Sequence, residues 1–155
     1  MKAFSVAFAP VAILLALLTA SCAPKGNRFS DFRDLPAEGW KYQSRIAFEP
    51  DIADSVASGR LIVSLRHTND YPYSNLWLEV AVKDSLTSSV DTLNIRLSDP
   101  HGRWLGHGIG TDFQVSDTLA RPVILTKASQ ITLRHIMRVD NLPEVSQLGL
   151  EFITD

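Results

Sequence analysis

The chain contains 155 residues, of which 45% are hydrophobic and 21% are charged, and its formal net charge is −2. Acidic and basic residues are scattered along the chain, so the composition excludes the basic footprint of a nucleic-acid-binding protein. A single cysteine excludes a framework of intramolecular disulfides.

The N-terminal segment has the features of a lipoprotein signal peptide. An almost uncharged run over residues 3–18, interrupted by Pro10, ends at small residues just before Cys22. A membrane-spanning helix needs roughly 20 apolar residues, so this shorter run favours a cleaved signal over residues 1–21. We expect Cys22 to be lipidated, with several acyl chains such as palmitate, because one chain binds a membrane only marginally. The aliphatic residue that usually stands three places before such a cysteine is here Leu18, four places before it, so secretion with an unmodified cysteine and an uncleaved anchor are the alternatives.

A short tether and one domain follow the cysteine. Residues 22–31 include Pro24, Gly26 and Asn27 and have little to bury, which predicts a lipidated tether. The remaining residues, 32–155, suffice for one domain, since the commonest domains have about 100–150 residues.

Beyond Trp40 the apolar residues recur with a period of two, which is typical of half-buried strands. Trp40, Tyr42, Ile46 and Phe48 alternate with polar residues, for example. The pattern predicts six strands, over residues 40–48, 61–65, 76–82, 93–97, 131–137 and 148–152, and shorter strands over residues 104–109 and 123–125. No helical periodicity outlasts the signal peptide. Strands with one apolar face must pair those faces, so we expect an all-β fold, an antiparallel β-sandwich of about seven or eight strands, with a barrel as the less favoured alternative.

The sequence carries none of the common catalytic motifs. It lacks a Gly-x-Ser-x-Gly elbow, a His-Glu-x-x-His pair, a Cys-His arrangement and a phosphate-binding glycine loop. We therefore expect a protein that is not an enzyme. A hydrolase remains the alternative, and it requires a cleft that brings His101 or His107 to an acidic residue.

Two groups of polar residues were candidates for metal binding or catalysis. His101 and His107 flank a glycine-rich loop near Asp99 and Asp112, and nitrogen and oxygen ligands of this kind can bind metals. The glycines explain the loop more simply as a bulged hairpin, so we expect no metal and no cofactor. Asp112 and Asp117 are expected in polar loops and not as a pair of catalytic carboxylates.

The other two histidines fall within predicted strands. His135 lies on the apolar face of its strand, which predicts a hydrogen-bonded core histidine, and His67 stands at a strand end. Neither position favours a catalytic base.

An outward-facing tryptophan raises the possibility of a binding surface. Trp77 falls on the opposite face from the apolar residues of its strand. With Trp104, Tyr71 and Tyr73 it could form a platform for glycan rings, and we expect instead that a loop such as residues 71–73, or the tether, covers it.

Three segments resemble a known family. Residues 65–78, with their Tyr-Pro-Tyr-Ser-Asn run, and residues 135–150, with their Met-Arg pair, are similar to the two signature stretches of the GldH family of gliding motility lipoproteins. Between them, residues 102–106 resemble the family's glycine-tryptophan turn. The Asn-Leu-Pro-Glu run at residues 141–144 departs from the glycine-containing turn of the family.

The resemblance implies a lipid-anchored envelope protein that acts with a gliding or type IX secretion-linked apparatus. It implies a membrane contact through the lipid and an envelope protein partner, and the scattered charges imply no nucleic acid. Surface-exported lipoproteins of the group that the chain resembles often carry acidic residues directly after the cysteine. No acidic residue stands at positions 23–26, so the resemblance favours the periplasmic face of the outer membrane. The residues singled out as partner-binding candidates are Arg66, Tyr71, Tyr73, Asn75, Trp77, Trp104 and Arg138, although a structural role competes for each of them: turn formation for Tyr71, Tyr73 and Asn75, and ion pairing or capping for the arginines.

Overall fold

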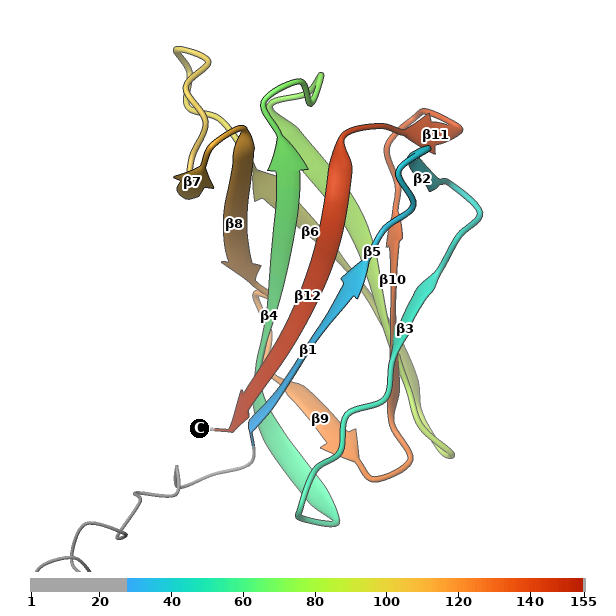
Figure 1. Ribbon diagram of the computed structural model, residues 1–155. Helices are drawn as coiled ribbons and strands as arrows, with labels where there is room; N and C mark the ends of the chain where they lie inside the picture. Colours follow the sequence, from blue (N-terminus) through green and yellow to red (C-terminus); the bar gives the residue numbers. More distant parts are fainter. Residues whose placement is uncertain (1–27, 155) are drawn as a thin grey trace, which may run out of the picture.

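The computed structural model describes residues 28–154, which form two β-sheets packed face to face (Figure 1). The first sheet has the order β1-β12-β4-β8-β7, and β9 also pairs with β4. Its strands are β1 (Arg28–Asp34), β4 (Val56–Thr68), β7 (His107–Ile109), β8 (Asp112–Thr118), β9 (Val123–Thr126) and β12 (Val145–Thr154). Cys22, the predicted lipidation site, lies outside the described residues.

The second sheet has four strands in the order β3-β10-β5-β6, and all neighbouring strands are antiparallel. They are β3 (Ile46–Phe48), β5 (Asn75–Lys83), β6 (Ser88–Arg96) and β10 (Gln130–His135). A small third sheet pairs β2 (Trp40–Lys41) with β11 (Asn141–Leu142). The all-β antiparallel architecture predicted from the sequence is thereby confirmed, with twelve strands in place of seven or eight.

The core lies between the two larger sheets and follows the alternation of the sequence. In β4 and β5 every second side chain is buried, because successive residues of a strand point to opposite faces. The largest fully buried side chains include Trp40, Phe48, Leu61 and Phe152. Burying one such side chain contributes about 1.5–3 kcal/mol, so the alternation accounts for most of the packing.

Four expectations about strand positions need correction. Residues 40–48 are not one strand, because a turn with a hydrogen bond from Ser44 N to Lys41 O (2.9 Å) separates β2 from β3. Of residues 104–109, only β7 forms a strand. Asp112 and Asp117 lie in β8 and not in loops. The first sheet begins at Arg28, four residues before the boundary expected at residue 32.

The sandwich has two ends with different contents (Figure 1). The upper end, as drawn, holds the connections at residues 69–74 and 97–106 and the turn before β12. The lower end holds the connections at residues 49–55, 84–87 and 127–129, together with Arg28 and Thr154. Antiparallel pairing fixes this arrangement, because Arg28 lies opposite Ile153 and Thr154 lies opposite Gly59 near the start of β4.

Within residues 28–154, no helix of the length and hydrophobicity that crossing a membrane requires is present.

Candidate functional site

Two signature-like segments of the sequence meet at the upper end of the sandwich. Residues 65–78 run from the end of β4 into β5, and residues 135–150 run from the end of β10 into β12. Most of the candidate residues lie in one of three places: a buried cluster, a surface patch on the second sheet, or the lining of a groove on the first sheet.

The buried cluster forms around His67, which is fully buried. Its ring centroid lies 4.6 Å from that of Trp104, 5.4 Å from that of Tyr71 and 5.9 Å from that of Phe113. The indole N–H of Trp104 donates to Asn69 Oδ1 (3.0 Å), and Tyr71 Oη donates to Asn75 O (3.2 Å). Tyr71 is only 3% exposed, so it fixes the turn and offers little surface.

Burial determines the charge state of this cluster. His67 Nδ1 lies 2.8 Å from Thr68 O, and its Nε2 has no hydrogen-bond partner among the described residues. Removal from water lowers the pKa of His67, with a partial offset from the bond to Thr68. Burial likewise raises the pKa of the Tyr71 phenol. Both groups are therefore neutral at pH 7 and serve the packing of the loop.

The surface patch surrounds Trp77, and we call it the Trp77 patch. Trp77 is 42% exposed and borders a shallow concavity of about 430 Å³. The backbone N–H of Trp77 donates to Met137 Sδ (3.4 Å), and Ile136 N donates to Trp77 O (2.9 Å). These bonds hold the segment after β10 beside β5. The members of the patch are Tyr73, Trp77, Ile136, Met137, Arg138 and Val139.

Three of the seven candidate residues thus come together on one surface, namely Tyr73, Trp77 and Arg138. Arg138 is exposed, and no ion-pair partner for it is found within residues 28–154. Tyr73 of the loop over residues 71–73 borders the same concavity as Trp77, but Trp77 remains 42% exposed. The tether, the other cover that we expected, lies mostly outside the described residues. The sequence pattern did not reveal Met137 as a member of this surface, because the period of two placed it on the buried face of a strand over residues 131–137. The strand β10 ends at His135, so the alternation does not extend to Met137.

A charged network lies next to the Trp77 patch on the outer face of the second sheet. Glu79 accepts hydrogen bonds from Arg134 (2.6 Å) and Arg45 (2.8 Å), and these bonds lower the pKa of Glu79. Arg134 also lies over the ring of Tyr42, 5.1 Å from its centroid. With both arginines paired, this network stiffens the sheet beneath the patch.

The predicted core histidine is found as expected. His135 is fully buried, and its Nε2 lies 3.0 Å from Trp40 O. Burial lowers its pKa, and its ring makes edge contacts with Trp40 and Tyr42. His135 therefore joins β10 to β2.

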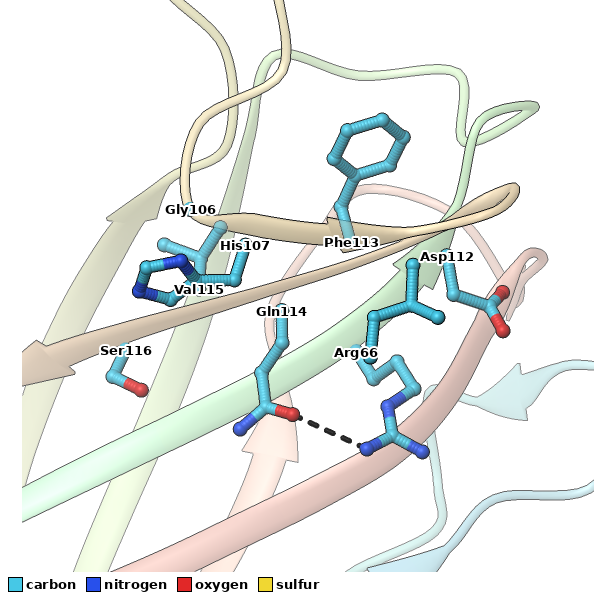
Figure 2. Close-up of a pocket in the computed structure, with 9 residues that line it drawn as sticks. Arg66, Gly106, His107, Asp112, Phe113, Gln114, Val115 and Ser116 are labelled. Carbon is cyan, nitrogen blue, oxygen red and sulfur yellow. Dashed lines mark hydrogen bonds between the residues drawn. The ribbon is translucent and has the colours of Figure 1, made fainter.

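The groove lies on the first sheet, beside β7 and β8, and has a volume of about 670 Å³. Figure 2 shows Arg66 and Gln114 pointing to the same side of the first sheet. Arg66 Nη2 donates a hydrogen bond to Gln114 Oε1 (3.2 Å). Phe113 points to the other side of β8, toward the buried cluster. His107 and Asp112 also line this groove, and Arg66 is separated by the sandwich from the Trp77 patch.

Asn75 and Asp99 serve local structure. Asn75 Nδ2 donates to Asn94 Oδ1 (2.7 Å) and so joins β5 to β6. Asp99 accepts bonds from His101 N (2.8 Å) and Arg103 Nε (2.7 Å), which closes the loop after β6. Across residues 28–154 no three His, Cys, Asp or Glu side chains are placed to hold a metal ion.

The aromatic rings do not form a flat platform for a sugar. The planes of Tyr71 and Trp104 are inclined by 59°, and those of Tyr71 and Tyr73 by 74°. Trp77 is the exposed ring, and it stands on the other sheet from Phe113 and His67. The geometry resembles a protein contact surface more than a stack of sugar-binding rings.

Comparisons with solved structures show only distant similarity. The globular domain of zebrafish complement 1qA protein aligns with a TM-score of 0.46 and 11% identity, covering 83% of this chain and 96% of that one. The coat protein of tobacco streak virus aligns with a TM-score of 0.34 and 11% identity, covering 85% and 88%.

Comparisons with sequences are far closer. The gliding motility lipoprotein GldH of Flavobacterium johnsoniae is 30% identical over 148 residues, which cover 94% of this chain and 90% of that protein. A GldH homolog of Christiangramia forsetii is 30% identical over 105 residues, covering 67% of this chain and 64% of that protein. Neither relative's name specifies a reaction. The family model of the GldH lipoprotein matches residues 27–152, nearly the whole described domain and both segments that meet at its upper end, and the chain therefore belongs to the GldH lipoprotein family.

Proposed function

We propose that this protein is a lipid-anchored, non-enzymatic adaptor or assembly factor of a gliding or type IX secretion-linked apparatus. Acyl chains on Cys22 hold it in the outer membrane, and the sandwich faces the periplasm. The upper end of the sandwich binds an envelope protein through the Trp77 patch.

The observation that carries this proposal is the exposed Trp77 beside Met137 and Arg138. Protein interfaces are enriched in aromatic residues, methionine and arginine, and their strongest contacts most often come from Trp, Tyr and Arg. Trp77 keeps 42% of its surface exposed, although both its N–H and its carbonyl are bonded to residues 136–137. A large apolar ring held in this way gains free energy when a partner covers it.

Photo-crosslinking in cells tests the partner. A photoreactive amino acid replaces Arg138 in the full-length, lipidated protein, and captured proteins are identified by mass spectrometry. The matched control places the same group at Lys83, which is exposed on the same face of β5 but at the lower end. We expect position 138 to capture gliding or secretion-apparatus proteins and position 83 to capture few of them.

Two variants make the test specific. Trp77→Ala should reduce capture from position 138 at least about tenfold, because truncation of a central interface tryptophan costs about 2 kcal/mol or more. Cys22→Ala shows which contacts need the anchor. Equal capture from positions 138 and 83, or capture of polysaccharide-associated proteins alone, contradicts the adaptor function and turns attention to glycan binding at Trp77.

The location has a separate test. Outer-membrane fractions should contain the wild-type protein and lack Cys22→Ala, since the acyl chains supply the attachment. A protease added to intact cells should leave the protein uncut if the sandwich faces the periplasm. Cleavage in intact cells would place it on the cell surface.

A further inference from the structure

We propose that the lower end of the sandwich rests on the lipid surface, with Val56, Leu86 and Ile124 in contact with the bilayer. This docking rests on the proposed lipid anchor at Cys22, and it adds a second, non-covalent contact with the membrane.

The position of the anchor limits which end can reach the membrane. Five residues, 23–27, separate Cys22 from the first strand, and the six Cα-to-Cα steps from Cys22 to Arg28 span at most about 20 Å when fully extended. Arg28 lies at the level of Ile153 and Arg60, near the lower end. From Arg60 up to Thr68 the strand rises about 26 Å, which is further than the tether reaches. An upright domain with its upper end on the bilayer is therefore excluded when Cys22 is in the membrane.

The same arithmetic brings the lower end to the bilayer. Below Arg60, β4 continues down to Val56, a further distance of about 13 Å. A tether of about 20 Å exceeds this distance by only about 7 Å. When the domain stands upright, its lower end therefore touches the lipid headgroups or lies just above them.

Three of the seven large apolar side chains that are exposed within residues 28–154 lie at this end, and they come from both sheets. On the first sheet, Val56 and Ile124 are 60% and 65% exposed. Val56 pairs with Thr126 and Ser58 pairs with Ile124, so Val56 and Ile124 are diagonal neighbours on one outward face, about 7–8 Å apart. On the second sheet, Leu86 at the β5–β6 turn is 94% exposed.

The turn that carries Leu86 is held rigidly. Asp84 Oδ1 accepts bonds from Leu86 N and Thr87 N, both 2.7 Å, and Asp84 N donates to Thr87 O (3.0 Å). An apolar tip fixed in this way loses little conformational entropy when it enters the lipid interface. The backbone that carries Leu86 is therefore already ordered before contact with lipid.

The charges at this end indicate the kind of lipid contact. Exposed acidic groups (Glu49, Asp51 and Asp54) and exposed basic groups (Lys83, Lys127 and, at the level of Arg28, Arg60) are present there in similar numbers. Because neither sign of charge predominates, the contact with lipid depends mainly on apolar insertion. We expect docking on vesicles of zwitterionic lipid, with little dependence on salt.

Fluorescence quenching by lipids tests the docking. The mature lipoprotein is reconstituted into phosphatidylcholine vesicles that contain a spin-labelled lipid quencher, after Leu86→Cys has been labelled with an environment-sensitive dye. The sulfur of Cys22 is blocked by its lipid. The matched control is Ile109→Cys, an aliphatic residue that is 86% exposed at the upper end. We expect a blue shift and at least about threefold stronger quenching at position 86, because side chains of a docked surface enter the headgroup and acyl boundary.

A second pair of variants removes the other contacts. Val56→Ser and Ile124→Ser, combined with the label at position 86, should weaken quenching, and they leave folding intact because both side chains are exposed. Flotation with the vesicles reports the anchor independently. Flotation without quenching at position 86 overturns the docking and leaves the adaptor function standing, whereas failure to float overturns both. A dye at position 86 that is already shielded in the Cys22→Ala protein, in buffer without detergent or lipid, would show that a second copy covers this end, and it too overturns the proposal.

Discussion

Glu144 has the left-handed backbone that the turn between β11 and β12 requires. Among the described residues it is the one non-glycine position with positive φ, at 64°. Its carboxylate accepts a hydrogen bond from Thr68 Oγ1, and its carbonyl accepts one from Thr68 N (3.0 Å). These two bonds to β4 hold the strained residue in place.

Substitution at this position separates backbone strain from the lost bond. Glu144→Gly and Glu144→Val both remove the carboxylate, but only valine is disfavoured at positive φ. We expect Glu144→Val to be less stable than Glu144→Gly by about 1–3 kcal/mol in urea unfolding. Equal stabilities would show that φ at this residue carries no strain.

The two buried histidines make stability depend on pH. Burial lowers the pKa of both His67 and His135 in the folded protein. As the pH falls below about 6.5, the unfolded chain takes up protons that the folded chain does not, so the free energy of unfolding falls. The loss is at most about 1.4 kcal/mol per pH unit for each histidine, until the pH reaches the folded-state pKa.

Urea unfolding at several pH values between 7.5 and 5.5 measures this slope. His67→Phe should give a shallower slope, because it removes one of the two titrating groups. Glu79 does not affect this slope. Because Arg134 and Arg45 lower its pKa, Glu79 makes the free energy of unfolding depend on pH only below the ordinary pKa of glutamate, outside the range measured. An unchanged slope in His67→Phe would assign the pH dependence to His135 or to other groups.

Among the elements, β4 organises the first sheet. It pairs with β12 on one side, and on the other side with β8 and, further down, with β9. Gly59 lies at the point where β4 is paired with both Thr154 and Val123. A Cβ at this position would lie 2.3 Å from Ile153 O, which is backbone and cannot move aside.

A second glycine of the same sheet provides a matched comparison. A Cβ at Gly149 would lie 2.4 Å from the ring of Phe32, which is 45% exposed and can rotate away. We expect Gly59→Ala to cost about 2–3 kcal/mol in thermal or urea unfolding and Gly149→Ala to cost less. The reverse order would mean that the β4–β12 pair opens more easily than the ring of Phe32 moves.

The same contacts explain which strands the sequence predicts. β5 and β12 follow a period of two and are evident from the sequence, because one of their faces is buried throughout. β1 has apolar Phe29 on one face and Phe32 on the other, and Phe32 is accommodated because Gly149 beside it has no side chain. Such compensation across strands is invisible in either strand alone. β8 has only Phe113 and Val115 as large apolar residues, too few for a periodic signal.

The grouping of the candidate residues could not be predicted from the sequence. The sequence marks Tyr73, Trp77 and Arg138 as partner-binding candidates. They lie together because the register places Ile136 beside Trp77. Tyr71 and Trp104 were chosen with them, and the structure places both around His67 instead. Register between distant strands is set by the whole sheet, so a single segment does not reveal it.

At the scale of the whole molecule, the two proposals assign the lower end to the membrane and the upper end to a partner, and tether length should control the membrane contact. Inserting about ten Gly and Ser residues between Cys22 and Arg28 roughly doubles or triples the reach of the tether and lowers the local concentration of the lower end at the bilayer. We expect the protein to remain in the membrane fraction while lipid quenching at a dye on Leu86→Cys falls. Quenching that is unaffected by the insertion would mean that the apolar contacts alone hold the domain down.

The pairing of β1 with β12 has a mechanical consequence. Any pull between an anchor at Cys22 and a partner at the upper end enters the domain through Arg28, along the axis of β1. The cross-strand bonds lie perpendicular to this axis, from Arg28 opposite Ile153 to Asp34 opposite Gln147. Such a load shears the whole ladder at once and does not peel it open bond by bond. The function proposed above, a link between a membrane and an envelope protein, would thus load this domain in the direction in which its strand geometry best resists tension.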